Sequence, residues 1–391
     1  MLGIRSVAGG LDGVVAARTR LSDVDGVNGR LHIAGYELEE LAGRVTFEEA
    51  AHLLWTGQLP TAAEARQLSE EMAALRELPN YVLNTVWRAA ERGASPIETL
   101  RTACSELPAV ATGPDGLSRG AELANAKMLA ARFPTIVAAH ARVAAGREPI
   151  DPRRELSLAS NFLYMLTGDI PDPVAARALD TYWVAMIDHG MNASTFTARV
   201  IASTRSDMLS AVTGALGALK GPLHGGAPAP VLEMLKAIGA VEHAEAWVRR
   251  ELAAGRRIMG FGHRLYRVRD PRAEVLGRVS EKLSRAVLQD RRLFDLARAV
   301  ERTVLRVLEE VKPGRGLQTN VEFYTALVLQ SLGLDPSAFV AVFACARCAG
   351  WCAHVMEQHA EDRLIRPLSE YVGPRGLTLT SRATIQHARG G

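Results

Sequence analysis

The stretch Ala338-Phe-Val-Ala-Val-Phe-Ala-Cys-Ala-Arg347-Cys-Ala-Gly-Trp-Cys-Ala353 contains one charged residue, Arg347. A helix that is apolar on every side is buried, so this stretch predicts a large helical core. Arginine stays protonated in proteins, and a buried Arg347 therefore needs an anionic partner. No acid lies within four residues of it on the same helix. The partner is then an acid from another part of the chain, or the carboxylate or phosphate of a ligand.

Helical patterns also cover the chain before this stretch. Residues 47–54 place apolar side chains at the i, i+3, i+4, i+7 spacing, and Thr46 with Glu49 matches a capping box. Three Asp-Pro pairs combine an N-cap residue with a proline suited to the first helical position. These pairs predict further helix starts at Asp151-Pro152, Asp270-Pro271 and Asp335-Pro336.

The clearest strand signal lies near the N-terminus. The turn-forming pairs Asp25-Gly26 and Asn28-Gly29 stand between the apolar segments Val14–Val24 and Arg30–Ile33. The sequence therefore predicts a mainly α protein with a small N-terminal β-hairpin.

The composition is that of an ordinary globular chain. Its 391 residues, 48% of them hydrophobic and 23% charged, are enough for two domains. The net charge of +3 is spread along the chain, which does not favour nucleic-acid binding. Met1–Gly10 lacks the apolar stretch of a signal peptide, and no apolar run predicts a membrane span. We expect a cytoplasmic protein without a nucleic-acid or membrane partner.

Three of the four cysteines could suggest a metal site. Cys345, Cys348 and Cys352 share one helical face. Zinc usually takes four ligands in paired short spacings, and no second pair is present. We therefore expect reduced thiols packed in a helix and no metal.

Two histidines lie where helices end. His224 lies in the glycine-rich loop Lys220–Ala227, between two predicted helices. Helix-end N–H groups would keep it neutral and suited to polarise a carbonyl, although such a loop can also be an ordinary turn. His189 follows an apolar helix and precedes a glycine, and a core histidine is the alternative to a binding role.

Two charged residues lie in the first turns of predicted helices. Arg272, after Asp270-Pro271, either adds charge to an anion site or is solvated. The preceding glycines, 260 and 262, do not fit the nucleotide-binding spacing. Glu322 begins an apolar helix, where a carboxyl group either acts as a general base or simply favours the helix dipole.

Taken in order, these segments resemble the citrate synthase family over nearly the whole chain. Each match is short, but the ordered set is specific. The matching segments are Asp23–Gly26, Gly29–Leu31, His189–Thr195, Gly221–Ala227, Gly260–Tyr266 with Asp270–Arg272, Asn320–Tyr324, Phe343–Arg347, Gly350-Trp351 and Arg366-Pro367.

The resemblance implies a two-domain, almost wholly α-helical fold around a cleft, working as a homodimer. The large domain would comprise residues 1–220 and 331–391, and the small domain, 221–330, would carry most catalytic residues. The implied activity is the condensation of acetyl-CoA with oxaloacetate to citrate and CoA. It needs no metal and no separate cofactor, because the CoA thioester is a substrate.

The resemblance also implies residue roles. Glu322 would remove a proton from the acyl methyl group while neutral His224 binds the thioester oxygen, and His263 would polarise the ketone of oxaloacetate. The oxaloacetate carboxylates would be held by four residues, the last contributed by the partner subunit: His189, Arg272, Arg347 and Arg366. CoA would contact one loop and nearby basic residues: Arg257, Met259, Gly260, Phe261, Gly262, Lys312 and Arg315.

Two positions depart from the family pattern. The usual catalytic aspartate is Glu322 here, and the usual asparagine after the histidine loop is Pro228. The extra methylene of Glu322 shifts the carboxylate, and Pro228 stiffens the turn after the histidine loop. We expect both departures to affect catalytic efficiency and the preference for the acyl group. The motifs do not exclude a 2-methylcitrate synthase that uses propionyl-CoA. A non-catalytic paralogue that binds acyl-CoA or oxaloacetate is disfavoured by the retained histidines and carboxylate.

Overall fold

The computed structural model describes residues 9–11, 13–110, 113–225, 228–288 and 290–378. This part of the chain is mainly α-helical, as the sequence predicted. The α-helices are α1 Leu38–Leu41, α2 Phe47–Thr56, α3 Ala62–Ala74, α4 Asn80–Glu91, α5 Pro96–Glu106, α6 Arg119–Ala144, α7 Leu158–Thr167, α8 Pro173–Met186, α9 Ala193–Ala202, α10 Met208–Leu219, α11 Pro228–Ile238, α12 Ala244–Ala253, α13 Pro271–Ala286, α14 Arg292–Val311, α15 Val321–Ser331 and α16 Phe339–Glu361. Short 3-10 helices are η1 Gly9–Leu11, η2 Gly113–Leu117, η3 Val241–His243 and η4 Pro336–Ala338.

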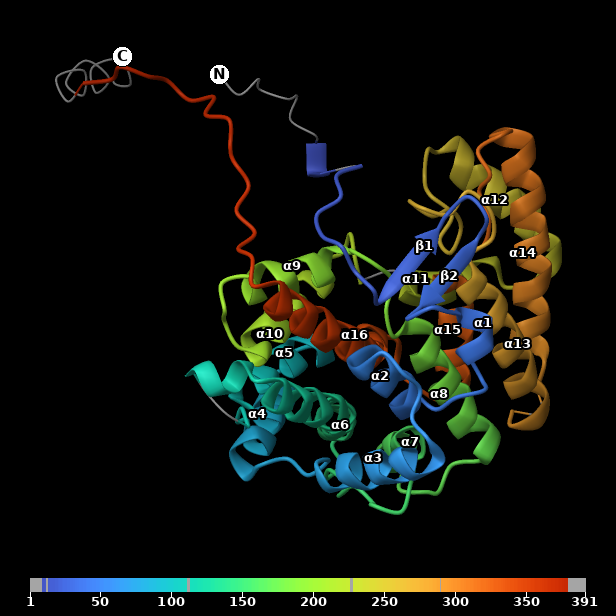
Figure 1. Ribbon diagram of the computed structural model, residues 1–391. Helices are drawn as coiled ribbons and strands as arrows, with labels where there is room; N and C mark the ends of the chain where they lie inside the picture. Colours follow the sequence, from blue (N-terminus) through green and yellow to red (C-terminus); the bar gives the residue numbers. More distant parts are fainter. Residues whose placement is uncertain (1–8, 12, 111–112, 226–227, 289, 379–391) are drawn as a thin grey trace, which may run out of the picture.

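Helix α16 forms the centre of the core (Figure 1). It packs against α2, α6, α8, α9 and α10, and the Trp55 Nε1 of α2 donates a hydrogen bond to the Ala349 carbonyl at 3.1 Å. By length and composition the stretch Pro336–Glu361 could cross a membrane, but 89% of its apolar window is buried inside the protein. It is therefore the buried core helix that the sequence predicted.

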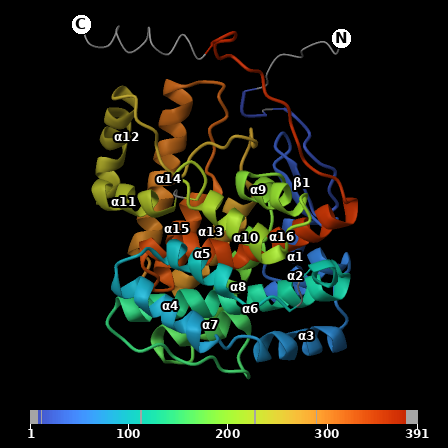
Figure 2. The same ribbon diagram turned by 90° about the vertical axis from the view of Figure 1, so that its left-hand side faces the viewer.

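Helices α11 to α14 lie to one side of this core. Helix α12 packs against α14, and both project beside the body that contains α16 (Figures 1 and 2). Helix α13 packs against α15 and α8, which connects this group of helices to the core. The site residues come from both sides of this junction.

The N-terminal sheet differs in detail from the expectation. Strand β1, Ser22–Asp25, pairs antiparallel with β2, Arg30–Ile33, with Asp25 opposite Arg30. The expected start of the first strand at Val14 is wrong, because residues 13–21 pair with no strand and Val14 is 49% exposed. A third strand, β3 Tyr36–Glu37, was not predicted, since two residues give no periodic signal.

Most predicted helix starts are confirmed. Thr46 and Glu49 form the capping box of α2, Asp270 caps α13, and Asp335 caps η4, which leads into α16. The start predicted at Asp151-Pro152 is wrong, since α7 begins at Leu158.

Side chains explain the delayed start of α7. Arg76 Nη1 donates to the carbonyls of Arg153 and Leu156, and Asn161 Oδ1 accepts from Arg153 N. These bonds hold residues 153–156 outside a helix.

Candidate active site

The loop between α12 and α13 is paired with the segment that leads into α15. Gly262 N donates to the Gln318 carbonyl at 2.8 Å, and Asn320 N donates to the Gly260 carbonyl at 2.9 Å. Gly260 has φ +82°, and a Cβ there would lie 2.9 Å from the Phe323 side chain, so the close approach requires glycine. Because Asn320 caps α15, this pairing holds the first turn of α15 beside the loop that carries His263.

Glu322 is a largely buried carboxyl group in that first turn. Burial raises the pKa of Glu322 to about 7; the positive charges of Arg272 and Arg257 oppose the increase, and Asp270 adds to it. A carboxyl group with this pKa can both accept and release a proton near neutral pH. The raised pKa is compatible with the general-base role that the sequence left open for Glu322.

The proton position on His263 follows from its contacts. Its Nδ1 accepts hydrogen bonds from the backbone N–H groups of Leu265 and Tyr266, at 3.0 and 3.2 Å. Burial lowers the pKa of His263 to about 4, and Arg272 lowers it further while Asp270 opposes. The ring is therefore neutral at pH 7 and carries its proton on Nε2, which can donate to a ligand.

His224 is the second neutral histidine, in the loop after α10, of which residues 226–227 lie outside the described part of the chain. Its Nε2 is 2.8 Å from the Ser194 hydroxyl, which also accepts from Trp351 Nε1 at 3.1 Å. Burial lowers the pKa of His224 to about 4, and the positive charge of Arg347 adds to this effect. The sequence predicted that helix-end N–H groups would keep His224 neutral. In the structure, burial and the charge of Arg347 lower its pKa instead.

Arg272 is buried, with 4% of its surface exposed. Its Nε and Nη2 donate to the two carboxylate oxygens of Asp270, at 3.0 and 2.8 Å. The solvated alternative for Arg272 is therefore wrong. The arginine is held in a fixed orientation by its own N-cap residue, in the two-bond geometry typical of strong Arg–carboxylate pairs.

Arg347 is also buried, with 2% exposed. Its Nε donates to the Met186 carbonyl at 2.8 Å, and its guanidinium lies 4.7 Å from the centre of the Phe343 ring. Burial lowers the pKa of Arg347 to about 10. Among the described residues it forms no ion pair with a carboxylate, although Asp188 is near enough to influence its pKa.

His189 joins this cluster from the loop after α8. Its ring centre lies 5.5 Å from that of His263, and its Nε2 is 3.1 Å from the Tyr266 hydroxyl. Burial holds the pKa of His189 well below its usual range, with further lowering by Arg272, Arg347 and His263. His189, His263, Arg272 and Arg347 thus influence one another electrostatically.

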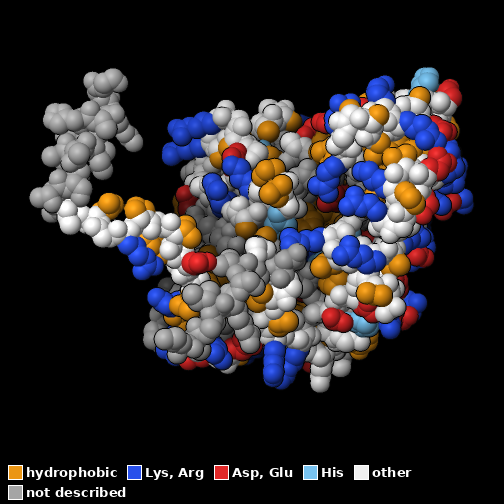
Figure 3. All heavy atoms as spheres, turned by 90° about the horizontal axis from the view of Figure 1, so that it is seen from above, with side chains coloured by type: hydrophobic (Ala, Val, Ile, Leu, Met, Phe, Trp, Pro, Cys, Tyr) orange, Lys and Arg blue, Asp and Glu red, His pale blue; other side chains and the backbone are white. Residues whose placement is uncertain are grey.

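The expected CoA contacts are brought together only in part. Four of them form the loop beside α15, where Phe261 packs on Phe323 with ring centres 5.3 Å apart: Met259, Gly260, Phe261 and Gly262. Arg257 is exposed and close enough to lower the pKa of Glu322. Lys312 and Arg315 lie on the turn after α14, and no described contact joins them to Glu322. Seen from above, Lys and Arg side chains border a hollow in which a histidine is visible (Figure 3).

Arg366 is not part of this cluster. It is exposed in the extended segment 363–378, which leaves the body after α16 (Figure 1).

The sequence interpretation gave no role to Tyr266, Ser194 or the carboxylate of Asp270 beyond its cap. A signal existed for Asp270, because an N-cap aspartate lies two residues before an arginine in the same first turn. Ser194 contacts His224, and Tyr266 contacts His189, only through the tertiary fold.

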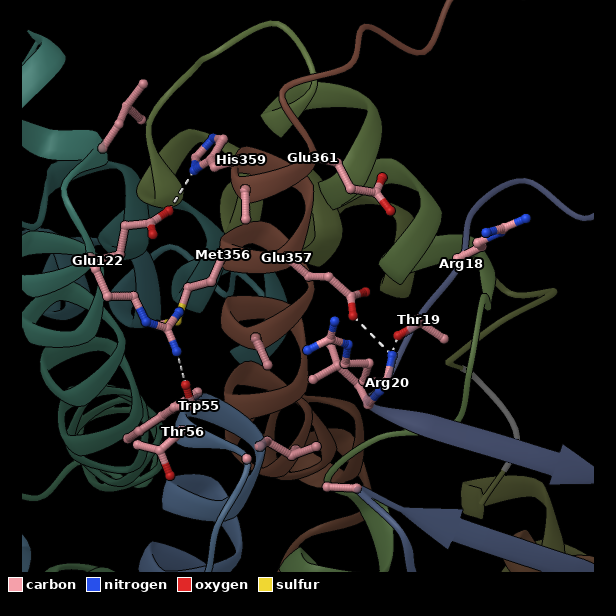
Figure 4. A pocket seen from close by; sticks show the side chains of 18 of the residues that line it. Arg18, Thr19, Arg20, Trp55, Thr56, Glu122, Met356, Glu357, His359 and Glu361 are labelled. Atoms are coloured by element: carbon pink, nitrogen blue, oxygen red, sulfur yellow. Dashed lines mark hydrogen bonds and ion pairs between the residues drawn. The ribbon is translucent and has the colours of Figure 1, made fainter.

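A separate cavity of about 830 Å³ lies between the C-terminal half of α16, the segment before β1 and the ends of α2 and α6 (Figure 4). Its lining includes Arg20, Trp55, Glu122, Glu357 and His359, and none of the predicted site residues.

The family model described as citrate synthase, C-terminal domain, matches residues 10–368. The chain belongs to the citrate synthase family. The citrate synthase of Haloferax volcanii is 42% identical over 95% of this chain and 97% of that protein. The 2-methylcitrate synthase of Mycobacterium tuberculosis (strain H37Rv) is 39% identical over 93% and 90%.

A solved citrate synthase structure agrees with this assignment. It is the ternary complex of carboxymethyl coenzyme A and oxaloacetate with the citrate synthase of Thermoplasma acidophilum, 29% identical, with a TM-score of 0.85 over 96% of this chain and 99% of that chain. The predicted fold class is confirmed, and the chain is a citrate synthase-type enzyme.

Proposed function

We propose that this citrate synthase family member condenses acetyl-CoA with oxaloacetate and water to give citrate and CoA. The observation that carries the proposal is the set of ionisation states in one cluster. Glu322 has a pKa near 7, while His224 and His263 have pKa values near 4 and are neutral. Two buried arginines supply positive charge beside them.

The first step is enolisation of the acyl thioester. The carboxylate of Glu322 takes a proton from the methyl carbon, and His224 hydrogen-bonds the thioester oxygen, where negative charge develops. A neutral donor suits this step, because an imidazolium would protonate the oxygen outright instead of sharing its proton. Ser194 fixes the orientation of this ring, since its hydroxyl lies 2.8 Å from Nε2 of His224.

The second step forms the carbon–carbon bond. The enolate carbon attacks the ketone carbon of oxaloacetate, and the Nε2–H of His263 donates to the oxygen as it becomes an alkoxide. Arg272, Arg347 and His189 hold the carboxylates of oxaloacetate, and Arg347 in particular has a buried charge without an ion-pair partner among the described residues. Water then hydrolyses the citryl thioester, which releases citrate and the CoA thiol.

We further propose that residues 221–330 move as a small domain against the rest of the chain. Closure would exclude water until the new bond has formed. The loop 257–262 would bind CoA, with Arg257, Lys312 and Arg315 as partners for its phosphates.

The segment 363–378 supports a homodimer. It carries exposed apolar side chains, including Leu368 at 88% and Val372 at 89%, whose burial against a second copy would be favourable. In such a dimer this segment would bring Arg366 to the oxaloacetate site of the other subunit. The proposed location is the cytoplasm.

A 2-methylcitrate synthase activity is the second candidate. The relative from Mycobacterium tuberculosis bears that name at 39% identity. Propionyl-CoA differs from acetyl-CoA by one methylene, worth about 1–3 kcal/mol in an apolar pocket.

Thiol release measured with and without oxaloacetate tests both candidates. We expect CoA release only when acyl-CoA and oxaloacetate are both present, and the ratio of kcat/KM for acetyl- and propionyl-CoA then decides between the two activities. Absence of release with acetyl-, propionyl- and butyryl-CoA alike would contradict the proposal.

A further inference from the structure

Tyr266 completes a triangle of rings with the two histidines expected to bind oxaloacetate. Its ring centre lies 4.8 Å from that of His263 and 5.6 Å from that of His189. Its hydroxyl is 3.1 Å from Nε2 of His189, and 3% of the residue is exposed. The contact crosses from the loop between α12 and α13 to the loop after α8.

The backbone around Tyr266 is held by the N-terminal hairpin. Arg267 N donates to the Gly26 carbonyl at 2.8 Å, and a Cβ at Gly26 would lie 2.2 Å from the Leu265 carbonyl oxygen. Tyr266 N itself donates to Nδ1 of His263. The phenol is therefore fixed at both ends, by its backbone and by His189.

The charges around the pair determine which partner donates. Burial and the neighbouring positive groups hold the pKa of His189 well below its usual range, so its ring is neutral and has one nitrogen without a proton. Burial raises the pKa of Tyr266, so the phenol keeps its proton at neutral pH. A phenol that keeps its proton can donate to the unprotonated nitrogen of a neutral imidazole, and the nitrogen 3.1 Å from the hydroxyl is Nε2.

We propose that Tyr266 is a positioning residue that donates its phenolic proton to Nε2 of His189 and thereby fixes the orientation and the Nδ1–H tautomer of that ring beside the oxaloacetate site. The inference rests on the proposed function, because it assigns Tyr266 to the oxaloacetate half of that site. Without the phenol, the imidazole proton would divide between both nitrogens and the ring could turn away from its binding orientation.

Tyr266→Phe removes only the hydroxyl and keeps the ring. Because one neutral hydrogen bond is lost, we expect the oxaloacetate Kd to rise roughly 2- to 10-fold. The KM for acyl-CoA should stay unchanged. Tyr324→Phe is the matched control, because Tyr324 lies on the same helix as Glu322 and is also buried. This change removes a hydroxyl that hydrogen-bonds Glu301 and Arg298 of α14. It should lower stability and leave the oxaloacetate Kd unchanged.

A double-mutant cycle with His189→Gln tests whether Tyr266 acts through His189. In the His189→Gln background, Tyr266→Phe should have no further effect on oxaloacetate binding measured by calorimetry. An equal loss in both backgrounds, or wild-type affinity in Tyr266→Phe, would overturn the proposal.

The histidine ring ¹⁵N shifts supply an independent readout that does not require turnover. Nε2 of His189 should be unprotonated in the wild-type protein and partly protonated in Tyr266→Phe. A protonated Nε2 in the wild-type protein would overturn the assigned direction of donation. Absence of thiol release by a wild-type protein with the expected ¹⁵N shifts would instead count against the proposed function alone.

Discussion

Asp188 and His354 form a completely buried pair in which His354 Nε2 lies 3.2 Å from Asp188 Oδ2. The same carboxylate oxygen accepts from the Ser22 hydroxyl of β1 at 2.5 Å. Nη1 of Arg199 lies 3.2 Å from Nδ1 of His354 and can only donate, so Nδ1 accepts and the ring N–H that faces Asp188 is on Nε2. Asp188 precedes His189, and the pair therefore anchors the loop that carries a site histidine to the core helix α16.

This chain of polar contacts reaches the separate cavity. Arg199 donates to Glu357 at 2.6 Å, and Glu357 accepts from the backbone N–H of Arg20, a contact visible in the cavity wall (Figure 4). Gly350 lets the loop that carries Asp188 lie directly against α16, because a Cβ at Gly350 would lie 2.3 Å from the Ile187 carbonyl oxygen. The site loop is thus tied to both the hairpin and α16.

Asp188→Asn should destabilise the protein in a pH-dependent way. Burial alone would raise the pKa of Asp188, but His354, Arg347 and Ser22 outweigh it and hold that pKa below its usual range. A carboxyl group with a lowered folded-state pKa contributes stability above its unfolded pKa of about 4, and this contribution is lost as the pH falls through the folded pKa. We expect Asp188→Asn to cost about 1–3 kcal/mol at pH 7 and less at pH 3.

Denaturant unfolding at both pH values measures this effect. Asp207→Asn is the matched control, since Asp207 also caps a helix and asparagine caps a helix about as well as aspartate. A cost that grows on acidification would contradict the role given to the Asp188 carboxylate.

The pH–rate profile should show the ionisation of Glu322. The proposed base must be deprotonated, and its pKa is about 7, so kcat/KM for the acyl-CoA should fall about tenfold per pH unit below pH 7. His224 and His263, with pKa values of about 4, stay neutral across this range and add no second limb above pH 5. Glu322→Gln should lower turnover by about 10²–10⁴-fold and leave the oxaloacetate Kd nearly intact. A wild-type profile that is flat from pH 5 to 9 would rule out Glu322 as the base.

Glu322→Gln should also stabilise the protein above neutral pH. A carboxyl group whose folded pKa is raised contributes most stability below its unfolded pKa of about 4, and this is lost as the pH rises through the folded value of about 7. Glutamine resembles the protonated form, so the variant should have a higher Tm than the wild type at pH 8 and a similar Tm at pH 4. The exposed Glu233→Gln on α11 should show no such pH dependence. A lower Tm for Glu322→Gln at pH 8 would show that the carboxylate stabilises the fold.

The fold could be predicted because its signals are local. The apolar stretch around Arg347 indicates a buried helix by composition alone, and Asp270 and Asp335 mark helix starts through bonds to neighbouring residues. Asp151 has the same local sequence signal, yet the backbone after it bonds to Arg76 and Asn161 from elsewhere. A long-range competitor of that kind leaves no trace in the local pattern.

The candidate residues of the site came from the family resemblance, and their ionisation states could not come from the sequence. That resemblance implied roles for His224, His263 and Glu322, but their pKa shifts depend mainly on burial, which only the folded structure defines. Tyr266 contacts a residue 77 positions away, and no sequence pattern links the two.

Arg366→Ala should impair oxaloacetate binding without unfolding the chain, because its side chain is exposed and bonds nothing within the described part of its own subunit. If Arg366 serves the partner's site, each site combines Glu322 of one subunit with Arg366 of the other. The variants Arg366→Ala and Glu322→Gln then damage contributions to a site that come from different subunits. A heterodimer of the two variants then has one site that combines an intact Glu322 with an intact Arg366, and one site that lacks both. Random pairing gives heterodimers in about half of all dimers, so co-expressed variants should recover about a quarter of wild-type activity. Thiol release by co-expressed chains, compared with each variant alone, measures this recovery. Recovery no greater than the mean of the two single variants, or a fully active monomer in solution, would show that Arg366 does not act across a subunit interface.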